Sequence, residues 1–188
     1  MCSISDMALS DYILDKPVLR TDRLVLRSLR PSDVPALLEW MPDRSMYKYW
    51  GKSAGKADKD PSLLFAHPEK PTKSFHWGIE YEGKVVGELW IYLIENDRMA
   101  KLAFRVGTLW QGLGIASEAV HATVDFCFRN TELKRIWTDV DMRNEASIRV
   151  LEKCEFLREG LIRQGKMVST WCDYYIYGRL ASDSYEGL

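Results

Sequence analysis

Hydrophobic positions along the chain follow two alternating periods, one of two residues that predicts strands and one of about 3.6 residues that predicts helices. Strands are expected over Arg23 to Leu29, over Phe75 to Tyr81 and over Lys84 to Ile94, the last two joined by a hairpin turn at Glu82-Gly83. A further apolar run, Leu102 to Val106, is expected to pair beside them. The pattern therefore predicts one strand followed by a three-strand meander.

Three segments have the helical period. The first, about Asp33 to Met41, has capping residues at its start and a proline in its first turn. The second begins after Gly114 and carries an apolar stripe opposite a charged stripe that contains His121. The third is capped by Asn144. Three more strands are expected around the third helix: RIWTDVD before it, and FLREGLIR and STWCDYYIYGRL after it.

The order of these elements indicates an α+β fold in a single domain. We expect that domain to span residues 1–188, with a core at 19–180 and terminal extensions at 1–18 and 181–188. The segment from Gly51 to Ser74 is rich in Gly, Pro and Lys, which predicts a long loop. Long loops in small domains are often functional, so this one is a candidate lid over a binding site.

Composition and charge narrow the class of protein. The 26 Lys and Arg residues nearly balance the 27 Asp and Glu residues, so no excess of charge points to nucleic acid. No apolar run approaches the roughly 20 residues that span a bilayer, and we expect a cytoplasmic protein without a membrane partner. The four cysteines are far apart and lack zinc-site spacing, so we expect reduced thiols and no metal.

The segment WQGLGIASEAV, residues 110–120, places two glycines at the start of the second helix. A dinucleotide fingerprint would need Gly or Ala where Ser117 stands, and a P-loop ending at Gly51 to Ser53 would need Gly where Met46 stands. Two interpretations remain open on the residues alone. One is a pyrophosphate cradle of backbone N–H groups at a helix start, and the other is a plain helix start with glycines for packing.

Wider context favours the cradle. The residues Gln111-x-x-Gly114-x-Ala116 resemble the acetyl-CoA signature Q/R-x-x-G-x-G/A of the GNAT family of N-acetyltransferases, and they follow the third strand of a meander. Four stretches, in the same order, resemble the RimJ/RimL-like branch that acetylates protein N-termini: LRTDRLVLRSLRPSD, WQGLGIASEAV, NEASIRVLEKCEFLREG and DYYIYGRL. The resemblance covers about residues 19–180.

This resemblance implies a fold and a cosubstrate. The GNAT fold is a three-layer αβα arrangement, with a mixed, mostly antiparallel sheet of about seven strands, helices on both faces and one splayed pair of parallel strands. Acetyl-CoA would lie in the splay, its pantetheine arm pairing with the backbone of Phe104, Arg105 and Val106 and within reach of Asn144. The pyrophosphate would sit on the backbone amides of Gln111, Gly112, Leu113, Gly114, Ile115 and Ala116.

The implied reaction is direct attack of a neutral amine on a thioester in a ternary complex, which needs a base for the amine and an acid for the thiolate. Ser147 is the candidate acid, because its hydroxyl can donate a proton and the resemblance puts it near the sulfur. The Tyr that many relatives carry one turn later is Leu151 here. The alternative for Ser147 is a first-turn serine bonded to nearby backbone. Glu88 is the candidate base, directly or through water, and the alternative is an ordinary strand-edge carboxylate. Asp173 is a second candidate base.

Other features leave the acceptor and the activity open. Glu155 stands where relatives have glycine, so we expect a rebuilt helix end. Many aromatic residues are candidates either for core packing or for an acceptor pocket. The acceptor amine could belong to a protein N-terminus, a polyamine, an aminoglycoside or an amino acid, and the chain to a monomer or a homodimer. The alternative functions are a non-catalytic acyl-CoA-binding or sensor module on the same fold and a purely structural interaction protein.

Overall fold

The computed structural model describes residues 16–50, 54–65 and 74–185, which form one eight-stranded sheet in the order β1-β2-β3-β4-β5-β6-β8-β7. Neighbouring strands are antiparallel except β5 and β6, which are parallel. The strands are β1 (Leu19–Arg20), β2 (Leu24–Arg27), β3 (Phe75–Tyr81), β4 (Lys84–Glu95), β5 (Met99–Val106), β6 (Arg135–Asp141), β7 (Leu157–Met167) and β8 (Thr170–Leu180). The predicted mixed, mostly antiparallel sheet is confirmed, and the two-residue β1 adds a strand that the pattern did not indicate.

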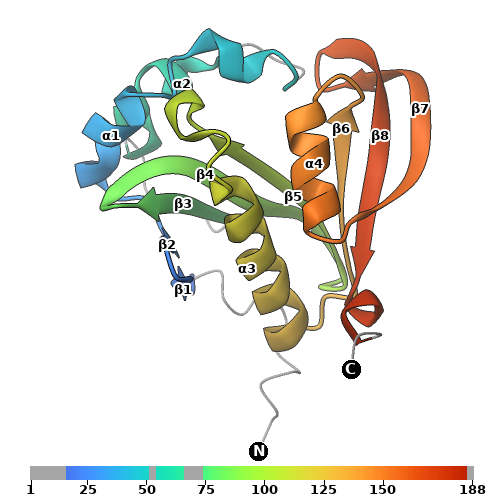
Figure 1. Ribbon diagram of the computed structural model, residues 1–188. Coiled ribbons are helices and arrows are strands. Elements are labelled where there is room, and N and C mark those ends of the chain that lie inside the picture. Colours follow the sequence, from blue (N-terminus) through green and yellow to red (C-terminus); the bar gives the residue numbers. More distant parts are fainter. Residues whose placement is uncertain (1–15, 51–53, 66–73, 186–188) are drawn as a thin grey trace, which may run out of the picture.

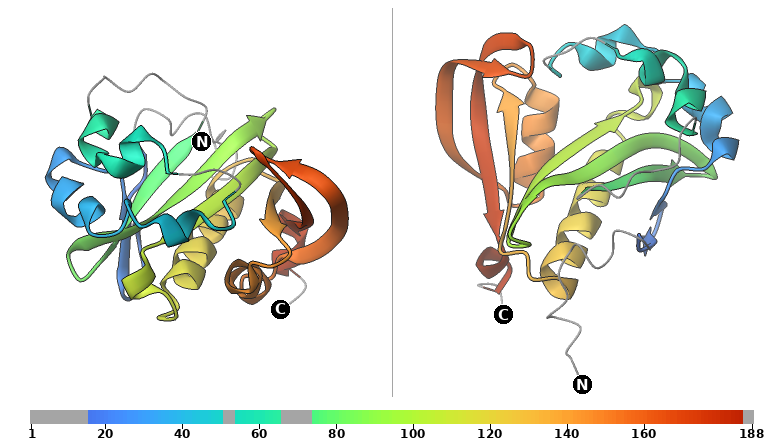
Figure 2. Two further views of the ribbon diagram at one scale, coloured as in Figure 1. Left: turned by 90° about the horizontal axis from the view of Figure 1, so that it is seen from above. Right: turned by 180° about the vertical axis from the view of Figure 1, so that it is seen from behind.

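Helices cover both faces of this sheet (Figures 1 and 2). The helices α3 (Ile115–Asn130) and α4 (Glu145–Lys153) share one core with the sheet, whereas α1 (Val34–Leu38) packs on the other face. Two adjacent residues of β4 mark the two faces: Val85 packs with the residues around α1, and Val86 belongs to the core beneath α3. Successive side chains of a strand point to opposite faces, so the sheet separates two apolar cores.

The segments between β2 and β3 are more helical than the sequence predicted. The expected helix over 33–41 is divided into a 3-10 turn and the shorter α1, and the expected loop at 51–74 contains a further helix and a 3-10 turn, while 51–53 and 66–73 lie outside the described residues. Asp58 caps that helix by accepting from the Gly55 amide at 2.7 Å. The short elements are η3 (Pro31–Asp33), η4 (Arg44–Tyr47), α2 (Lys56–Lys59), η5 (Pro61–Phe65), η6 (Thr108–Trp110) and η7 (Ala181–Tyr185).

The structure shows the surroundings of several residues that the sequence analysis singled out. Asn144 caps α4 as predicted, and within that helix Glu145 pairs with Arg149 one turn later at 3.3 Å. His121 is exposed on α3. Cys127, Cys154 and Cys172 are buried free thiols, and Cys2 lies outside the described residues. Among the helices of the described ranges, none combines the length and the apolar character that crossing a membrane requires.

The parallel strands β5 and β6 separate partway along their length. Their pairing runs from Met99 opposite Arg135 to Lys101 opposite Trp137 and ends there. Beyond that point β5 stays paired with β4 as far as Val106, and β6 stays paired with β8 as far as Asp141. The two halves of the sheet therefore diverge, and α4 stands beside the open end (Figure 1). This is the splayed pair that the GNAT resemblance implied.

The expectation of a rebuilt end of α4 was wrong. Glu155 adopts the left-handed conformation itself, with φ of 61°, at a cost of about 1 kcal/mol relative to glycine. Its carboxylate pairs with Arg179, whose side chain is 7% exposed and also donates to the Cys154 carbonyl at 2.9 Å. The ion pair with a largely buried arginine offsets the backbone strain, so the helix ends where a glycine would end it.

Candidate active site

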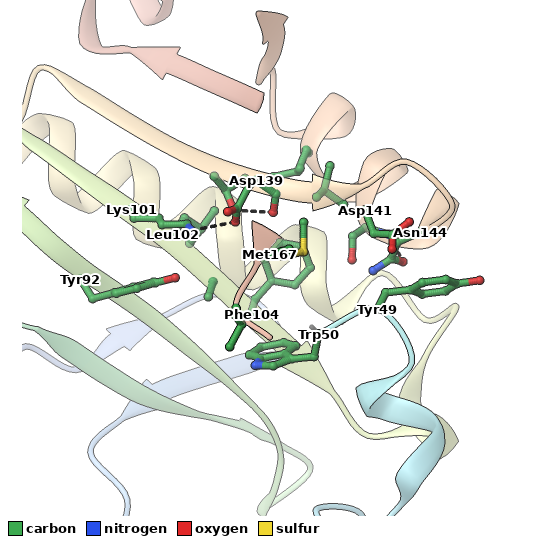
Figure 3. A pocket seen from close by; sticks show the side chains of 16 residues that line it. Tyr49, Trp50, Tyr92, Lys101, Leu102, Phe104, Asp139, Asp141, Asn144 and Met167 are labelled. Carbon is green, nitrogen blue, oxygen red and sulfur yellow. Dashed lines mark hydrogen bonds and ion pairs between the residues drawn. The ribbon is translucent and has the colours of Figure 1, made fainter. Parts of the chain in front are cut away.

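A pocket of about 130 Å³ occupies the divergence between β5 and β6 (Figure 3). Residues 102–104 of β5 form one wall and residues 138–141 of β6 form the other. Asn144, the N-cap of α4, lines the pocket together with two residues of that helix, Ser147 and Leu151. The pocket exists because the sheet opens here and each strand keeps its hydrogen bonds on its outer side only.

The structure brings three of the sequence-predicted site residues together in this pocket. Phe104, Asn144 and Ser147 all line it, although they come from different elements. Asn144 Oδ1 accepts a hydrogen bond from the Ser147 backbone N–H at 3.2 Å, which satisfies one of the open donors at the start of α4. This bond fixes the first turn of the helix and with it the position of the Ser147 side chain.

The Gly-rich turn joins the end of β5 to the start of α3. Gly112 and Gly114 have φ of 78° and 80°, a conformation that side chains with a Cβ rarely adopt. Residues 111–114 are exposed, and Gln111 Nε2 donates to the Val106 carbonyl at 2.9 Å. Arg23 lies against the turn, donating from Nη1 to the Leu113 carbonyl at 3.1 Å. The turn therefore exposes backbone at the positive end of a 16-residue helix.

Arg105 turns its side chain away from the Gly-rich turn, into a charged cluster on the α1 face. Its guanidinium contacts Glu88, Asp58 at 2.9 Å and the Tyr47 hydroxyl at 2.8 Å. Burial disfavours the charge on Arg105, but Glu88, Tyr47 and Asp58 outweigh that effect and raise its pKa. Only the backbone of Arg105 is left for the predicted pairing with a pantetheine arm.

Glu88 lies in the same cluster and is 1% exposed. Since β4 runs between β3 and β5, the alternative of a strand-edge carboxylate was wrong. One carboxylate oxygen lies 2.7 Å from His76 Nε2 and the other accepts from Arg105. Burial favours the neutral carboxyl, yet the hydrogen bond and charge of His76 and the charge of Arg105 prevail, so the pKa of Glu88 is lowered.

The two candidate bases lie outside the set of described residues that line the pocket. Glu88 reaches toward it only through neighbours: His76 stacks on Trp90 at 4.8 Å, and Trp90 meets the edge of Trp50, a lining residue, at 5.9 Å. The Asp173 carboxylate lies on the β7–β8 hairpin, where it accepts a hydrogen bond from the backbone N–H of Gln164 at 2.7 Å. Neither carboxylate faces the space between β5 and β6 directly.

Sequence reasoning missed the charged pair inside the pocket. Lys101 Nζ lies 2.7 Å from Asp139 Oδ1, and both residues line the pocket, with Tyr92 on the side of Lys101 and Tyr49 on the side of Asn144 (Figure 3). The alternation of RIWTDVD places Asp139 on the face opposite Ile136, but the strand beside it could not be known from the pattern. Of the aromatic residues that were candidates either for core packing or for an acceptor pocket, Trp40, Tyr47 and Trp77 belong to the core.

Comparison with known proteins identifies the family. The model of the acetyltransferase (GNAT) domain matches residues 23–157. The chain belongs to the GNAT acetyltransferase family. An N-acetyltransferase of Bacillus subtilis, the uncharacterized YoaA, is 29% identical over 79% of this chain and 87% of its own length. The expected enzyme class, an N-acetyltransferase, is thereby confirmed, and the splayed β5–β6 pair is the GNAT feature that positions the pocket.

Solved acetyltransferase structures with bound CoA have the same fold. The spermidine N-acetyltransferase of Vibrio cholerae, in complex with CoA and spermine, superposes with a TM-score of 0.73 at 20% identity over 86% of this chain and 98% of its own. RimL, a ribosomal L7/L12 α-N-protein acetyltransferase in complex with CoA, superposes with a TM-score of 0.71 at 20% identity over 87% and 98%. At these identities the similarity establishes the fold.

Proposed function

We propose that the protein transfers an acetyl group from acetyl-CoA to a primary amine by direct attack in a ternary complex, at the pocket between β5 and β6. The observation that carries the proposal is the meeting of Phe104, Asn144 and Ser147 in one pocket at the splay. The acceptor is a protein N-terminal α-amine or a small-molecule amine. The GNAT neighbours that carry CoA support the choice of cosubstrate.

The Gly-rich turn fits a pyrophosphate. A Cβ built on Gly112 meets no described atom within 4 Å, and one built on Gly114 meets the end of Arg23 at 3.4 Å, so the outer side of the turn is open apart from that arginine. The amides from Gln111 to Ala116 would hold the pyrophosphate at the start of α3, where the helix dipole favours negative charge. The edge of β5 from Phe104 to Val106, which lies beyond the end of its pairing with β6, would hold the pantetheine arm, together with Asn144. Acetyl-CoA supplies an acyl group that is activated toward a neutral amine.

Ser147 is the proposed donor to the leaving thiolate. Its backbone N–H is engaged by Asn144 at 3.2 Å, so the residue is held in the first turn of α4 while its side chain lines the pocket. A hydroxyl can donate its proton to sulfur and recover one from water. A backbone N–H of the diverging part of β5 would stabilise negative charge on the thioester oxygen.

Glu88 is the proposed base in an indirect role. An ionised carboxylate only accepts hydrogen bonds, so in this proposal a neutral His76 donates its Nε2–H to Glu88 and keeps Nδ1 as an acceptor until it takes up the proton of the amine. In this proposal His76 takes the amine proton through water and Glu88 is a positioning residue that sets the ring tautomer. The His76 ring is partly exposed and stacks on Trp90, next to the pocket-lining Trp50.

Release of CoA thiol from acetyl-CoA tests the function. We expect thiol release with at least one amine among peptides with free N-termini, polyamines, aminoglycosides and amino acids, and a second product of acetylated amine. If acetyl-CoA binds but no thiol is released in the presence of any of these amines, the protein is instead a non-catalytic acyl-CoA-binding module. Absence of binding would leave only a structural interaction protein.

Variants of His76, the proposed base, and of Glu88, which positions it, test this assignment. His76→Gln and Glu88→Gln are each expected to lower kcat by about 10²-fold or more while the KM for acetyl-CoA stays unchanged, since neither side chain touches the proposed cosubstrate site. His121→Gln, an exposed histidine on α3, is the matched control and should keep full activity. A full kcat in His76→Gln would overturn this assignment and leave the pocket carboxylates as the candidates.

A further inference from the structure

In the pocket between β5 and β6, a carboxylate and two aromatic rings surround the ammonium group of Lys101. We call this arrangement the ammonium site. Lys101 Nζ lies 2.7 Å from Asp139 Oδ1, 4.9 Å from the ring centre of Trp137 and 5.9 Å from that of Tyr92. The Lys101 side chain is 13% exposed and the Asp139 side chain 24%. A carboxylate with two aromatic faces is the chemistry that proteins use to bind ammonium groups.

This ammonium site lies at the narrow end of the splay, on the face of the sheet opposite α3. Lys101 and Trp137 form the last residue pair of β5 with β6. Their neighbours Leu102 and Ile136 are buried in the core beneath α3, so Lys101, Trp137 and Asp139 point to the opposite face. The Gly-rich turn leads into α3, on the other side of the sheet. An amine that enters opposite the cosubstrate therefore meets Lys101.

The charges around the pocket are balanced in pairs. Asp139 is paired with Lys101, and Asp141, the other lining carboxylate, is paired with Arg143 at 2.6 Å. An acceptor with two ammonium groups would bring its second charge close to Lys101 or would have to displace it. Like charges at such distances repel, and moving Lys101 breaks a charge-assisted hydrogen bond in a half-buried site. A monoamine incurs neither cost.

We propose that Lys101 determines the acceptor class of this site by filling its ammonium subsite, so that the enzyme accepts monoamines flanked by apolar or aromatic groups and rejects polyamines. This inference rests on the proposed function, because it assigns the acceptor of the same pocket. The rings of Tyr49, Trp50 and Tyr92 are the surfaces that such an acceptor packs against. The RimL-like acceptor, a single α-amine, meets this requirement, whereas spermidine does not.

Two amines of the same length test whether Lys101 excludes an acceptor with a second ammonium group. Butylamine and 1,4-diaminobutane differ by one ammonium group, so the ratio of their kcat/KM values measures tolerance of the second charge. The wild-type enzyme should favour butylamine by about tenfold or more. Lys101→Met keeps the length of the side chain and leaves Asp139 with an open ammonium subsite, so the ratio should move by at least about tenfold toward the diamine. Lys101→Gln is the second variant, should Lys101→Met fold poorly.

Two controls show whether the subsite causes the change. In Lys101→Met combined with Asp139→Asn, the carboxylate is neutral and the shift toward the diamine should disappear. Lys84→Met removes a lysine from an exposed pair with Glu39 and should leave the ratio at the wild-type value. Equal use of both amines by the wild-type enzyme would overturn the proposal. So would a ratio in the Lys101 variants that equals the wild-type ratio.

Thermal denaturation keeps this test separate from turnover. With CoA present, 1,4-diaminobutane should raise the midpoint of Lys101→Met and leave that of the wild-type protein unchanged. If no amine releases thiol in any variant, the proposed function fails, while the midpoints still decide whether Lys101 fills an ammonium subsite. A midpoint that rises equally in both proteins, or in neither, would contradict the subsite.

Discussion

Glu88 Oε1 lies 2.7 Å from His76 Nε2, and the other oxygen of the same carboxylate accepts from the Arg105 guanidinium. A carboxylate that is 1% exposed is thus ionised between two donors in the middle of the sheet. Asp58 of α2 contacts the same guanidinium at 2.9 Å. The cluster therefore ties the segment before β3 to the central strands, next to the residues that flank the pocket.

Removing the Glu88 charge should destabilise the protein at neutral pH. Glu88→Gln leaves Arg105 with one carboxylate partner instead of two, and we expect the free energy of unfolding to fall by about 3 kcal/mol or more. Glu39→Gln, at an exposed ion pair with Lys84, is the matched control and should cost at most about 1 kcal/mol. Urea unfolding at pH 7 measures both. A loss in Glu88→Gln no larger than the control would show that the cluster contributes little.

The same contact makes stability depend on pH. The folded-state pKa of Glu88 lies below its ordinary value of 4.5, because His76 and Arg105 outweigh the effect of burial. Its stabilising effect is therefore fully present above the unfolded-state pKa and is lost as the pH falls through the folded-state pKa. We expect the difference in unfolding free energy between wild type and Glu88→Gln to shrink in acid. A difference in unfolding free energy that grew as the pH fell below 4.5 would contradict a lowered pKa of Glu88.

Ser147 and Asn144 should separate chemistry from stability. Ser147→Ala keeps the backbone N–H that Asn144 caps, so the unfolding free energy should stay unchanged while kcat falls by about 10²-fold or more. Asn144→Ala removes the cap and should cost about 1 kcal/mol of stability. Steady-state kinetics and urea unfolding of the two variants measure this. A loss in Ser147→Ala confined to the affinity for acetyl-CoA would make Ser147 a binding residue.

The Gly-rich turn should tolerate no large side chain if it holds a pyrophosphate. Gly114→Trp is expected to abolish detectable CoA binding while the protein stays folded, because the side chain covers the amides at the start of α3. Gly83→Trp is the matched control: this hairpin glycine has φ of 77° and open space around it, so it incurs similar backbone strain away from the site. Calorimetric titration with CoA compares them. Unchanged affinity in Gly114→Trp would remove the cradle.

Two substitutions at Glu155 should differ in stability from one another. Glu155→Ala keeps a Cβ at φ of 61° and loses the ion pair with Arg179, so it should destabilise the protein. Glu155→Gly loses the same pair but relieves the strain, so it should be more stable than Glu155→Ala by about 1 kcal/mol. Thermal unfolding of both variants tests the difference. Equal stabilities would show that the left-handed conformation carries no strain.

The parts of the fold that follow from short-range pattern could be predicted from the sequence. β6 has the predicted bounds of RIWTDVD, β3 and β4 meet at the predicted turn, and Asn144 caps α4 as expected. Each of these depends on residues a few positions apart. The two-residue β1 and the helices within 51–74 carry too little periodicity to be recognised, because contacts with distant residues hold them in place.

The site was predicted where a motif described it and missed where strand pairing creates it. Asn144, Ser147 and the Gly-rich turn lie in recognisable motifs. The pair of Lys101 with Asp139 depends on which strand neighbours β6, and the contact of Glu88 with Arg105 depends on the register of β4 with β5. These strand pairings join residues that are far apart in the sequence, so the local pattern does not predict them. The charged residues that they bring together therefore could not be recognised as parts of the site.

Thermal denaturation with and without about 1 mM acetyl-CoA, beside free CoA, tests most directly whether the splay between β5 and β6 is a cosubstrate site, since a ligand that binds only the folded protein raises the midpoint. We predict a clear rise with both ligands in the wild-type protein. An unchanged midpoint with both would contradict the assignment of the Gly-rich turn as a pyrophosphate cradle, and with it the acetyltransferase activity proposed for the pocket.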